Sequence, residues 1–232
     1  MGDASWIGLL DISDLIPDGW TLIGGQLVHL HCFERNIFPT RPTTDIDTVL
    51  DIRTYPEMLL TFTKTLKDLG FSSPLTNQRE HQYRWIREDA VIDLLIPTNL
   101  GNRSSARKGV TGSTTISTLG AQGALNRAEK VLIKIGPRHG IINRPHLMGS
   151  IIMKSGAFSN FQDQARDRHL MDLLTLFSLI EINDEKDFKI THEERKRINL
   201  VITAIQDNPF ILNTVEGGRE ALDRFKILFN AN

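Results

Sequence analysis

Asp45 and Asp47, with one residue between them, lie at the start of a β-forming run, and Asp93 lies in a later apolar run. Side chains alternate along a strand, so Asp45 and Asp47 point to the same side, about 6–7 Å apart at their Cα atoms. Asp93 lies among apolar residues, where an acid is costly unless it is paired or bound to a metal. If the two strands are neighbours, the three carboxylates converge. Such a set of hard oxygen donors suits Mg²⁺.

Each of these acids also has an ordinary structural interpretation. Asp45 could cap a turn, Asp47 could be solvated at a sheet edge, and Asp93 could pair with a core arginine. Further support comes from Gly24 and Gly25, which lie between an apolar run and a predicted helix. Glycines at such a position let the backbone approach a phosphate, and a helix N-terminus favours its negative charge. An ordinary tight turn is the alternative for the two glycines.

A lysine and an aspartate in the second half of the chain form another candidate pair. Lys154 lies in an apolar helical segment, where its ammonium either reaches water or faces a bound phosphate. On the next predicted helix, Arg168, His169 and Asp172 share one polar face because residues three and four apart are neighbours. Asp172 could pair with Arg168. Alternatively, it could orient Lys154 and favour its charged form.

The elements that must position these residues form a mixed α/β half followed by a helical half. Apolar alternation and turn residues predict strands over 45–52 and 130–135, a hairpin of 82–87 with 90–96, and helices over 26–33 and 56–69. Residues 99–118 are rich in Gly, Ser and Thr and are predicted to form a mobile loop. Helical spacing follows over 149–161, 164–182, 193–206 and 218–229, with a capping box of Thr191 and Glu194.

We therefore expect an α+β protein with two domains. Residues 1–144 form a mixed sheet with flanking helices, and residues 145–232 form a C-terminal helical domain, with the boundary near Arg144. A single cysteine, Cys32, cannot form an intrachain disulfide, and acids interrupt the apolar residues at the N-terminus, so no secretion signal is evident. No run of about 18 apolar residues is present. We expect a cytoplasmic protein without a membrane partner.

The charges of the chain balance in total but not in position. The 232 residues carry 27 Lys and Arg against 28 Asp and Glu, a formal charge of -1, which excludes a uniformly basic nucleic-acid binder. Between Leu94 and Ser150, however, eight bases face a single acid, Glu129. Such asymmetry favours an anionic partner.

The combined pattern resembles the polymerase-β-like nucleotidyltransferase superfamily. The likeness rests on these residues, within positions 20–96: Gly24, Gly25, Arg41, Thr43, Asp45, Asp47 and Asp93. The resemblance implies that the three aspartates bind two Mg²⁺ ions and that the Gly-Gly turn holds a nucleoside triphosphate (NTP). On this basis we expect Thr43 and Thr44 to help position the triphosphate.

The second half narrows the resemblance to the AbiEii/MenT-like toxin nucleotidyltransferases, over about residues 20–180. Lys154 on one predicted helix and Asp172 on the next are similar to that group, as is the segment from 123–129 to 144–147. The resemblance implies Mg²⁺-dependent transfer of a nucleoside monophosphate from NTP to an acceptor. For several members the acceptor is the 3′ end of tRNA, and the proteins are toxins with an antitoxin partner.

The resemblance gives the remaining residues roles and leaves alternatives. Arg41 and Lys154 would neutralise charge on the leaving pyrophosphate, and Asp172 would orient Lys154. The same site could instead modify a small molecule, as in aminoglycoside nucleotidyltransferases. Pro42 departs from the pattern, so a non-catalytic nucleotide-binding homologue is a further alternative. A zinc site at 29–32 is disfavoured, because no second cysteine pair completes four ligands.

Overall fold

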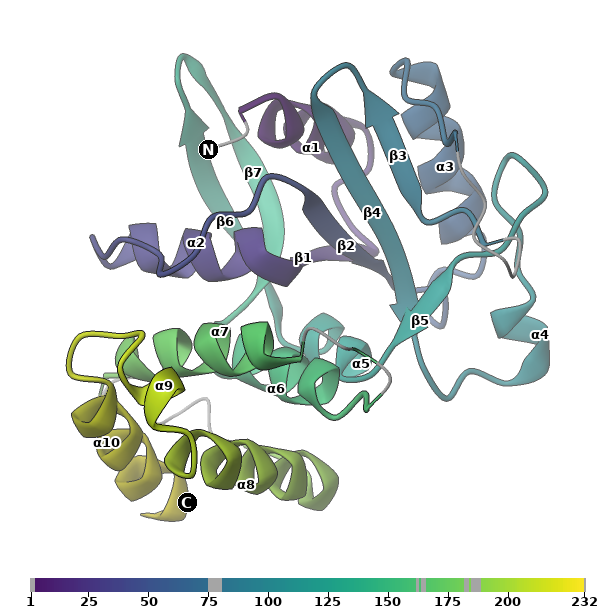
Figure 1. Ribbon diagram of the computed structural model, residues 1–232. Helices are drawn as coiled ribbons and strands as arrows, with labels where there is room; N and C mark the ends of the chain where they lie inside the picture. The colour runs from purple at the N-terminus through teal and green to yellow at the C-terminus, as the bar shows by residue number, and fades with distance from the viewer. Residues whose placement is uncertain are drawn as a thin grey trace. The chain divides into compact units, whose positions relative to one another are not determined.

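The computed structural model describes residues 3–74, 81–161, 163, 166–181, 184 and 189–231 (Figure 1). Its strands are β1 (Trp20–Ile23), β2 (Ile46–Leu50), β3 (Arg84–Arg87), β4 (Ala90–Pro97), β5 (Ile116–Thr118), β6 (Ala128–Ile135) and β7 (Arg138–Pro145). Its helices are α1 (Asp3–Leu15), α2 (Gly24–Glu34), α3 (Met58–Asp68), α4 (Asn102–Ser105), α5 (Ala121–Leu125), α6 (Leu147–Phe158), α7 (Asp167–Ser178), α8 (His192–Gln206), α9 (Pro209–Leu212) and α10 (Gly218–Ala231).

The chain divides into two compact units, which we call the sheet unit and the helical unit. The sheet unit comprises Met1–Gln26 and Thr43–Pro145, and the helical unit comprises Leu27–Pro42 and His146–Asn232. The division after Pro145 lies one residue beyond the boundary expected from the sequence. The segment Leu27–Pro42, which includes most of α2, belongs to the helical unit. The sequence prediction, with one boundary near Arg144, assigned this segment to the first domain.

The sheet unit contains a mixed sheet in the order β1-β2-β4-β3, with β5 beside the end of β4. The central pair, β2 and β4, is parallel, whereas β1 and β3 run antiparallel to their neighbours. Strands β6 and β7 form a separate hairpin, and α1 packs against both β4 and β7. The buried ring of Trp6 and the side chains of Leu9 and Leu10 anchor α1 in this core. The expected mixed sheet with flanking helices is confirmed.

The helical unit is built around one apolar core. Helices α6, α7, α8, α9 and α10 contribute buried leucines, isoleucines and phenylalanines, and α2 adds Val28 and Cys32. Phe177 of α7 stacks on Phe225 of α10 with ring centroids 3.8 Å apart. The predicted capping box is confirmed, because Thr191 accepts from the backbone of Glu194 and the Glu194 carboxylate accepts in return. The shared core thus packs α6 and α7, which carry Lys154 and Asp172, against the other helices of this unit.

Several sequence expectations were wrong or incomplete. The predicted mobile loop at 99–118 contains α4 and β5, and β5 gains its ladder partner from the end of β4. The prediction omitted α1 and β7. Strand β7 pairs with β6 in the hairpin, and its polar residues Arg138, His139 and Arg144 are exposed or only partly buried. Of the predicted helix 164–182, both end residues lie outside the described part of the chain. Within the described residues, no helix has the length and apolar character needed to cross a membrane.

Candidate active site

Two of the predicted carboxylates lie side by side across the centre of the mixed sheet. Asp47 of β2 is the register partner of Asp93 of β4. Partners on adjacent parallel strands present their side chains on the same face, about 5 Å apart. The condition set by the sequence, that the two strands are neighbours, is therefore met for Asp47 and Asp93. Neither carboxylate can lie there at low energy without a hydrogen-bond donor or a cation.

The third carboxylate joins them through an arginine of the edge strand β3. Arg84, the register partner of Asp93, donates from Nε and Nη2 to the two Asp93 oxygens at 2.9 and 2.7 Å. Its Nη2 also donates to Oδ2 of Asp45 at 3.2 Å. Thr43 donates to the other Asp45 oxygen at 3.0 Å. We call Asp45, Asp47 and Asp93 the carboxylate cluster; Arg84 is its cation in this structure.

The Gly-Gly turn is fitted closely to this cluster. Ile23, the last residue of β1, is the register partner of Asp47, so α2 begins directly beside it. Gly24 has a φ of +79°, and a Cβ there would collide with the Asp47 carboxylate. A Cβ on Gly25 would come within 2.9 Å of the Thr43 side chain. Both glycines are thus required by close packing, whether or not the turn also approaches a phosphate.

A pair of contacts outside the predicted set fixes the segment that leads into Asp45. Gln26 donates to the backbone oxygen of Thr43 at 2.8 Å and accepts from the Trp6 ring nitrogen at 3.1 Å. These two hydrogen bonds tie α1, the start of α2 and the residues before β2 together. Thr44, also predicted to position a triphosphate, is exposed. The sequence contains no local signal for Gln26, because its partner lies 17 residues away.

The donor chemistry of the carboxylate cluster fits a hard divalent cation, although its present geometry is arranged around Arg84. Asp45 is 37% exposed, Asp93 is 8% exposed, and burial raises the pKa of Asp93 more than Arg84 lowers it. Within the described part of the chain, no three acidic, histidine or cysteine side chains already converge as metal ligands. Three carboxylates on one face are nevertheless the oxygen donors that Mg²⁺ takes.

The remaining predicted residues form a second charged group, within the helical unit. Asp172 of α7 accepts from Nε and Nη2 of Arg41, both at 2.8 Å, and its Oδ2 lies 2.5 Å from Nζ of Lys154 on α6. Lys154 and Asp172 are 5% and 2% exposed. We call these three residues the Asp172 cluster. Arg168, the other possible partner of Asp172, pairs with Asp163 instead.

The Asp172 cluster shapes the ionisation of its neighbours. Burial opposes the charge on Asp172, but Lys154 and Arg41 outweigh it and lower the pKa of this carboxyl. Burial and then the charge of Lys154 lower the pKa of His169 to about 4. Burial raises the pKa of the Cys32 thiol to about 11, and Asp172 adds to the shift. Asp172 thus favours its charged form, whereas burial favours the neutral forms of His169 and Cys32.

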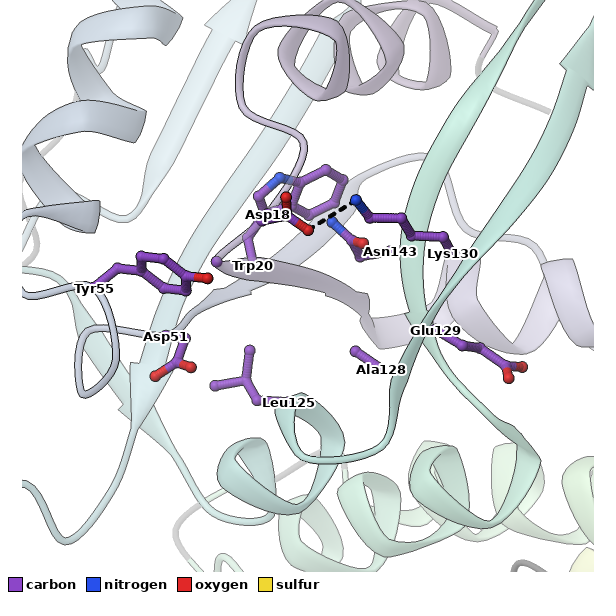
Figure 2. Close-up of a pocket in the computed structure, with 10 residues that line it drawn as sticks. Asp18, Trp20, Asp51, Tyr55, Leu125, Ala128, Glu129, Lys130 and Asn143 are labelled. Atoms are coloured by element: carbon purple, nitrogen blue, oxygen red, sulfur yellow. Dashed lines mark ion pairs between the residues drawn. The ribbon is translucent and has the colours of Figure 1, made fainter.

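A pocket of about 200 Å³ in the sheet unit lies away from the carboxylate cluster (Figure 2). Trp20 and Asp51 line it, at the opposite end of β1 and β2 from Asp47. Asp51 lies four residue steps along the chain from Asp47, about 13 Å in an extended strand. The Asp18–Lys130 ion pair, at 2.9 Å, closes one side. Since none of the three carboxylates lines this pocket, it is not the site that the motifs predict.

The basic stretch from 94 to 150 is partly neutralised by the fold. Four of its bases form ion pairs, at 2.5–3.5 Å, with these partners: Arg107 with Glu57, Lys130 with Asp18, Arg138 with Asp11 and Asp14, and Arg144 with Glu129. Arg103, Lys108 and Lys134 have no carboxylate partner among the described residues. The positive surface inferred from the sequence is therefore smaller than eight bases would make it.

Comparison with known proteins supports the fold. No protein-family model matches the chain, and no curated protein sequence matches it. The chain is similar to the crystal structure of an antigenic nucleotidyltransferase-like protein from Paracoccidioides brasiliensis, with a TM-score of 0.51 and 13% sequence identity. The match covers 95% of this chain and 90% of that chain. Both units together thus have a nucleotidyltransferase-like fold.

Proposed function

We propose that this protein is a metal-dependent nucleotidyltransferase that transfers a nucleoside monophosphate from an NTP to an acceptor hydroxyl. The observation that carries the proposal is the register pairing of Asp47 with Asp93, with Asp45 linked to Asp93 through Arg84 and the Gly-Gly turn beside Asp47. A turn at a helix N-terminus next to convergent carboxylates suits a metal-bound triphosphate. The nucleotidyltransferase-like fold supports the same enzyme class.

The carboxylate cluster would hold the metal, and the surrounding residues would orient it. When bound, Mg²⁺ neutralises the triphosphate and lowers the pKa of an attacking hydroxyl. Asp45 would provide a ligand from the residue before β2, Asp47 one from β2 and Asp93 one from β4. Thr43 keeps one Asp45 oxygen in a fixed direction at 3.0 Å. Gly24 allows Asp47 to lie against the backbone, where a larger residue would displace it.

The roles of the Asp172 cluster in the reaction stay predictions from the family resemblance. By that resemblance, Lys154 and Arg41 would neutralise the leaving pyrophosphate, and Asp172 would orient Lys154. The ion pair between Lys154 and Asp172 supports the orienting role, because it fixes the ammonium group at 2.5 Å from one oxygen. Measuring both the transfer activity and the urea denaturation of Lys154→Ala distinguishes a role in the reaction from a role in stability alone.

For the acceptor we propose RNA, and specifically the 3′ end of tRNA, with the protein acting as a toxin that an antitoxin controls. The support is the family resemblance together with the bases Arg103, Lys108 and Lys134, which lack carboxylate partners among the described residues. A small cationic acceptor would need an acidic pocket at the reaction site. The pocket in Figure 2 contains acidic residues, but none of the three carboxylates of the proposed reaction site lines it.

The direct test incubates the protein with each α-labelled NTP, Mg²⁺ and a tRNA pool, and measures label in RNA. Wild type is expected to label tRNA, whereas Asp47→Ala and Lys154→Ala lose the activity. Labelling by Asp47→Ala at the wild-type rate would contradict the proposal. Toxicity on expression, abolished by Asp47→Ala, is the expected cellular counterpart.

Salt dependence tests the RNA acceptor separately. Each lysine that contacts a phosphate contributes about 0.9 to the slope of log affinity against log salt. Lys108→Ala and Lys134→Ala are each expected to lower the slope for tRNA by about one unit. Lys130→Ala is the matched control, because its ammonium already pairs with Asp18. Equal slopes for all three variants and wild type would count against tRNA binding at this surface.

A further inference from the structure

The side chain of Arg84 occupies the place in the carboxylate cluster where a cation is needed. It binds both oxygens of Asp93, at 2.9 and 2.7 Å, and one oxygen of Asp45, at 3.2 Å. We propose that Arg84 is an internal counter-ion that competes with the divalent metal and must release Asp93 when the metal binds. This inference rests on the proposed function, since it concerns the same metal site.

The competition follows from the lone pairs of Asp93. Both of its oxygens accept charge-assisted hydrogen bonds from one planar guanidinium, the strongest arrangement available to a carboxylate and an arginine. A metal ligated by Asp93 would take at least one of these oxygens. It would also place a second positive charge within a few ångströms of the guanidinium. The two cations therefore cannot both bind Asp93 at full strength.

The position of Arg84 allows it to leave. It lies on β3, the outer strand of the sheet order, and its side chain is 38% exposed. By contrast, Arg41 reaches an Asp172 that is only 2% exposed and shares it with a buried lysine. An exposed side chain at a sheet edge can move into water without opening the core. Until a metal arrives, Arg84 offsets the repulsion between Asp45 and Asp93.

A purely structural role for Arg84 makes the opposite prediction. If the pair only fixed Asp93 in place, its removal would disorder the carboxylate and weaken metal binding. If Arg84 competes, its removal strengthens metal binding. Arg87 provides a matched control on the same strand: it pairs with Asp11 at 3.2 Å and stacks on Phe71, with its guanidinium carbon 4.6 Å from the ring centroid.

The test measures Mn²⁺ affinity of the full chain by the electron paramagnetic resonance signal of free Mn²⁺, an ion that also prefers oxygen ligands. Arg84→Gln is expected to bind Mn²⁺ about tenfold more tightly than wild type, within the range by which outer groups tune metal sites. Arg87→Gln is expected to match wild type. Asp47→Asn is expected to weaken binding.

Unchanged or weaker Mn²⁺ binding by Arg84→Gln would overturn the inference. If Asp47→Asn still weakened binding in that case, the proposed metal site would stand without the role of Arg84. Absence of Mn²⁺ binding in both wild type and Arg84→Gln would instead contradict the metal site itself. Circular dichroism checks that each variant is folded. Should Arg84→Gln not fold, Arg84→Lys keeps the charge but loses the two-pronged bond, and tighter Mn²⁺ binding is again expected.

Discussion

The carboxylate cluster and the Asp172 cluster use the same kind of ion pair for opposite purposes. Each contains an arginine that binds both oxygens of one aspartate. In the sheet unit, two carboxylates, Asp45 and Asp93, bind one guanidinium, and Asp47 is the register partner of Asp93, so negative charge is in excess. In the helical unit, one carboxylate serves Arg41 and Lys154, so positive charge is in excess. The first group is suited to a cation and the second to an anion.

The two clusters also differ in burial, which decides what each ion pair contributes. Asp45 and Arg84 are 37% and 38% exposed, whereas Lys154 and Asp172 are 5% and 2% exposed. Exposed charges exchange partners at little cost, because water solvates them. Buried charges cannot lose a partner without a large penalty. We therefore expect substitutions in the carboxylate cluster to affect activity and those in the Asp172 cluster to affect stability first.

The largest effect is expected from Asp172→Ala, which leaves Lys154 buried beside Arg41 without a counter-ion. Breaking a buried pair from one side costs about 3–5 kcal/mol. Urea denaturation measures the loss. Asp184→Ala is the matched control in the same unit, because Asp184 pairs with Arg35 at 20% exposure and should contribute about 0–1 kcal/mol. Equal losses in the free energy of unfolding for the two variants would contradict the expected difference between buried and exposed ion pairs.

The next effect concerns the Gly-Gly turn. Gly24→Ala adds a Cβ that collides with the Asp47 carboxylate, so nucleotidyl transfer should fall by about 100-fold, or ~2.7 kcal/mol in the barrier. Gly112→Ala is a close control: Gly112 has a φ of +83°, and its Cβ would meet nothing within 4 Å. Both variants carry the same backbone strain. A similar loss of activity in Gly112→Ala would contradict the claim that Gly24→Ala acts by displacing Asp47.

A smaller effect is expected from pH in the helical unit. His169 contacts Asp163 and is influenced by Lys154, Arg168 and Asp172, and its pKa falls from 6.5 to about 4. The unfolded chain therefore binds a proton that the folded chain rejects. Stability should decrease as pH falls below 6.5, by up to about 2 kcal/mol at pH 5, and level off below about pH 4.

His169→Gln tests this dependence, because glutamine can still donate to Asp163 but does not titrate. Thermal melts at pH 7 and pH 5 should show a smaller decrease for the variant than for wild type. The same decrease in both proteins would assign the pH dependence to other groups. Such a result would also indicate that the Asp172 cluster does not repel a proton from His169.

The sequence predicted the centre of the site better than its surroundings. Alternation placed Asp45 and Asp47 on one face, and the structure adds the register with Asp93. The role of Arg84 was missed although its signal was present. A two-residue turn at Glu88 and Asp89 pairs 87 with 90, and hence Arg84 with Asp93. Counting outward from the turn of the predicted hairpin would have identified Arg84 as the partner of Asp93, on an edge strand rather than in the core.

Other features depend on contacts that no local pattern contains. Three bases of the basic stretch pair with acids far away in the chain, such as Asp11 for Arg138 and Glu57 for Arg107. The asymmetry along the sequence is therefore reduced in space. Likewise, Leu27–Pro42 joins the helical unit because Val28 and Cys32 pack into its core. Neither grouping follows from residue spacing, since both are set by tertiary packing.

The central claim is that the carboxylate cluster supports transfer of a nucleoside monophosphate, which cleaves the bond between the α- and β-phosphates. The most direct measurement compares acceptor labelling from α-labelled and γ-labelled NTP while pyrophosphate is quantified. The account predicts label from the α-phosphate alone, one pyrophosphate per nucleotide transferred, and loss of both signals in Asp47→Asn. Label from the γ-phosphate, release of orthophosphate instead of pyrophosphate, or full activity in Asp47→Asn would contradict it.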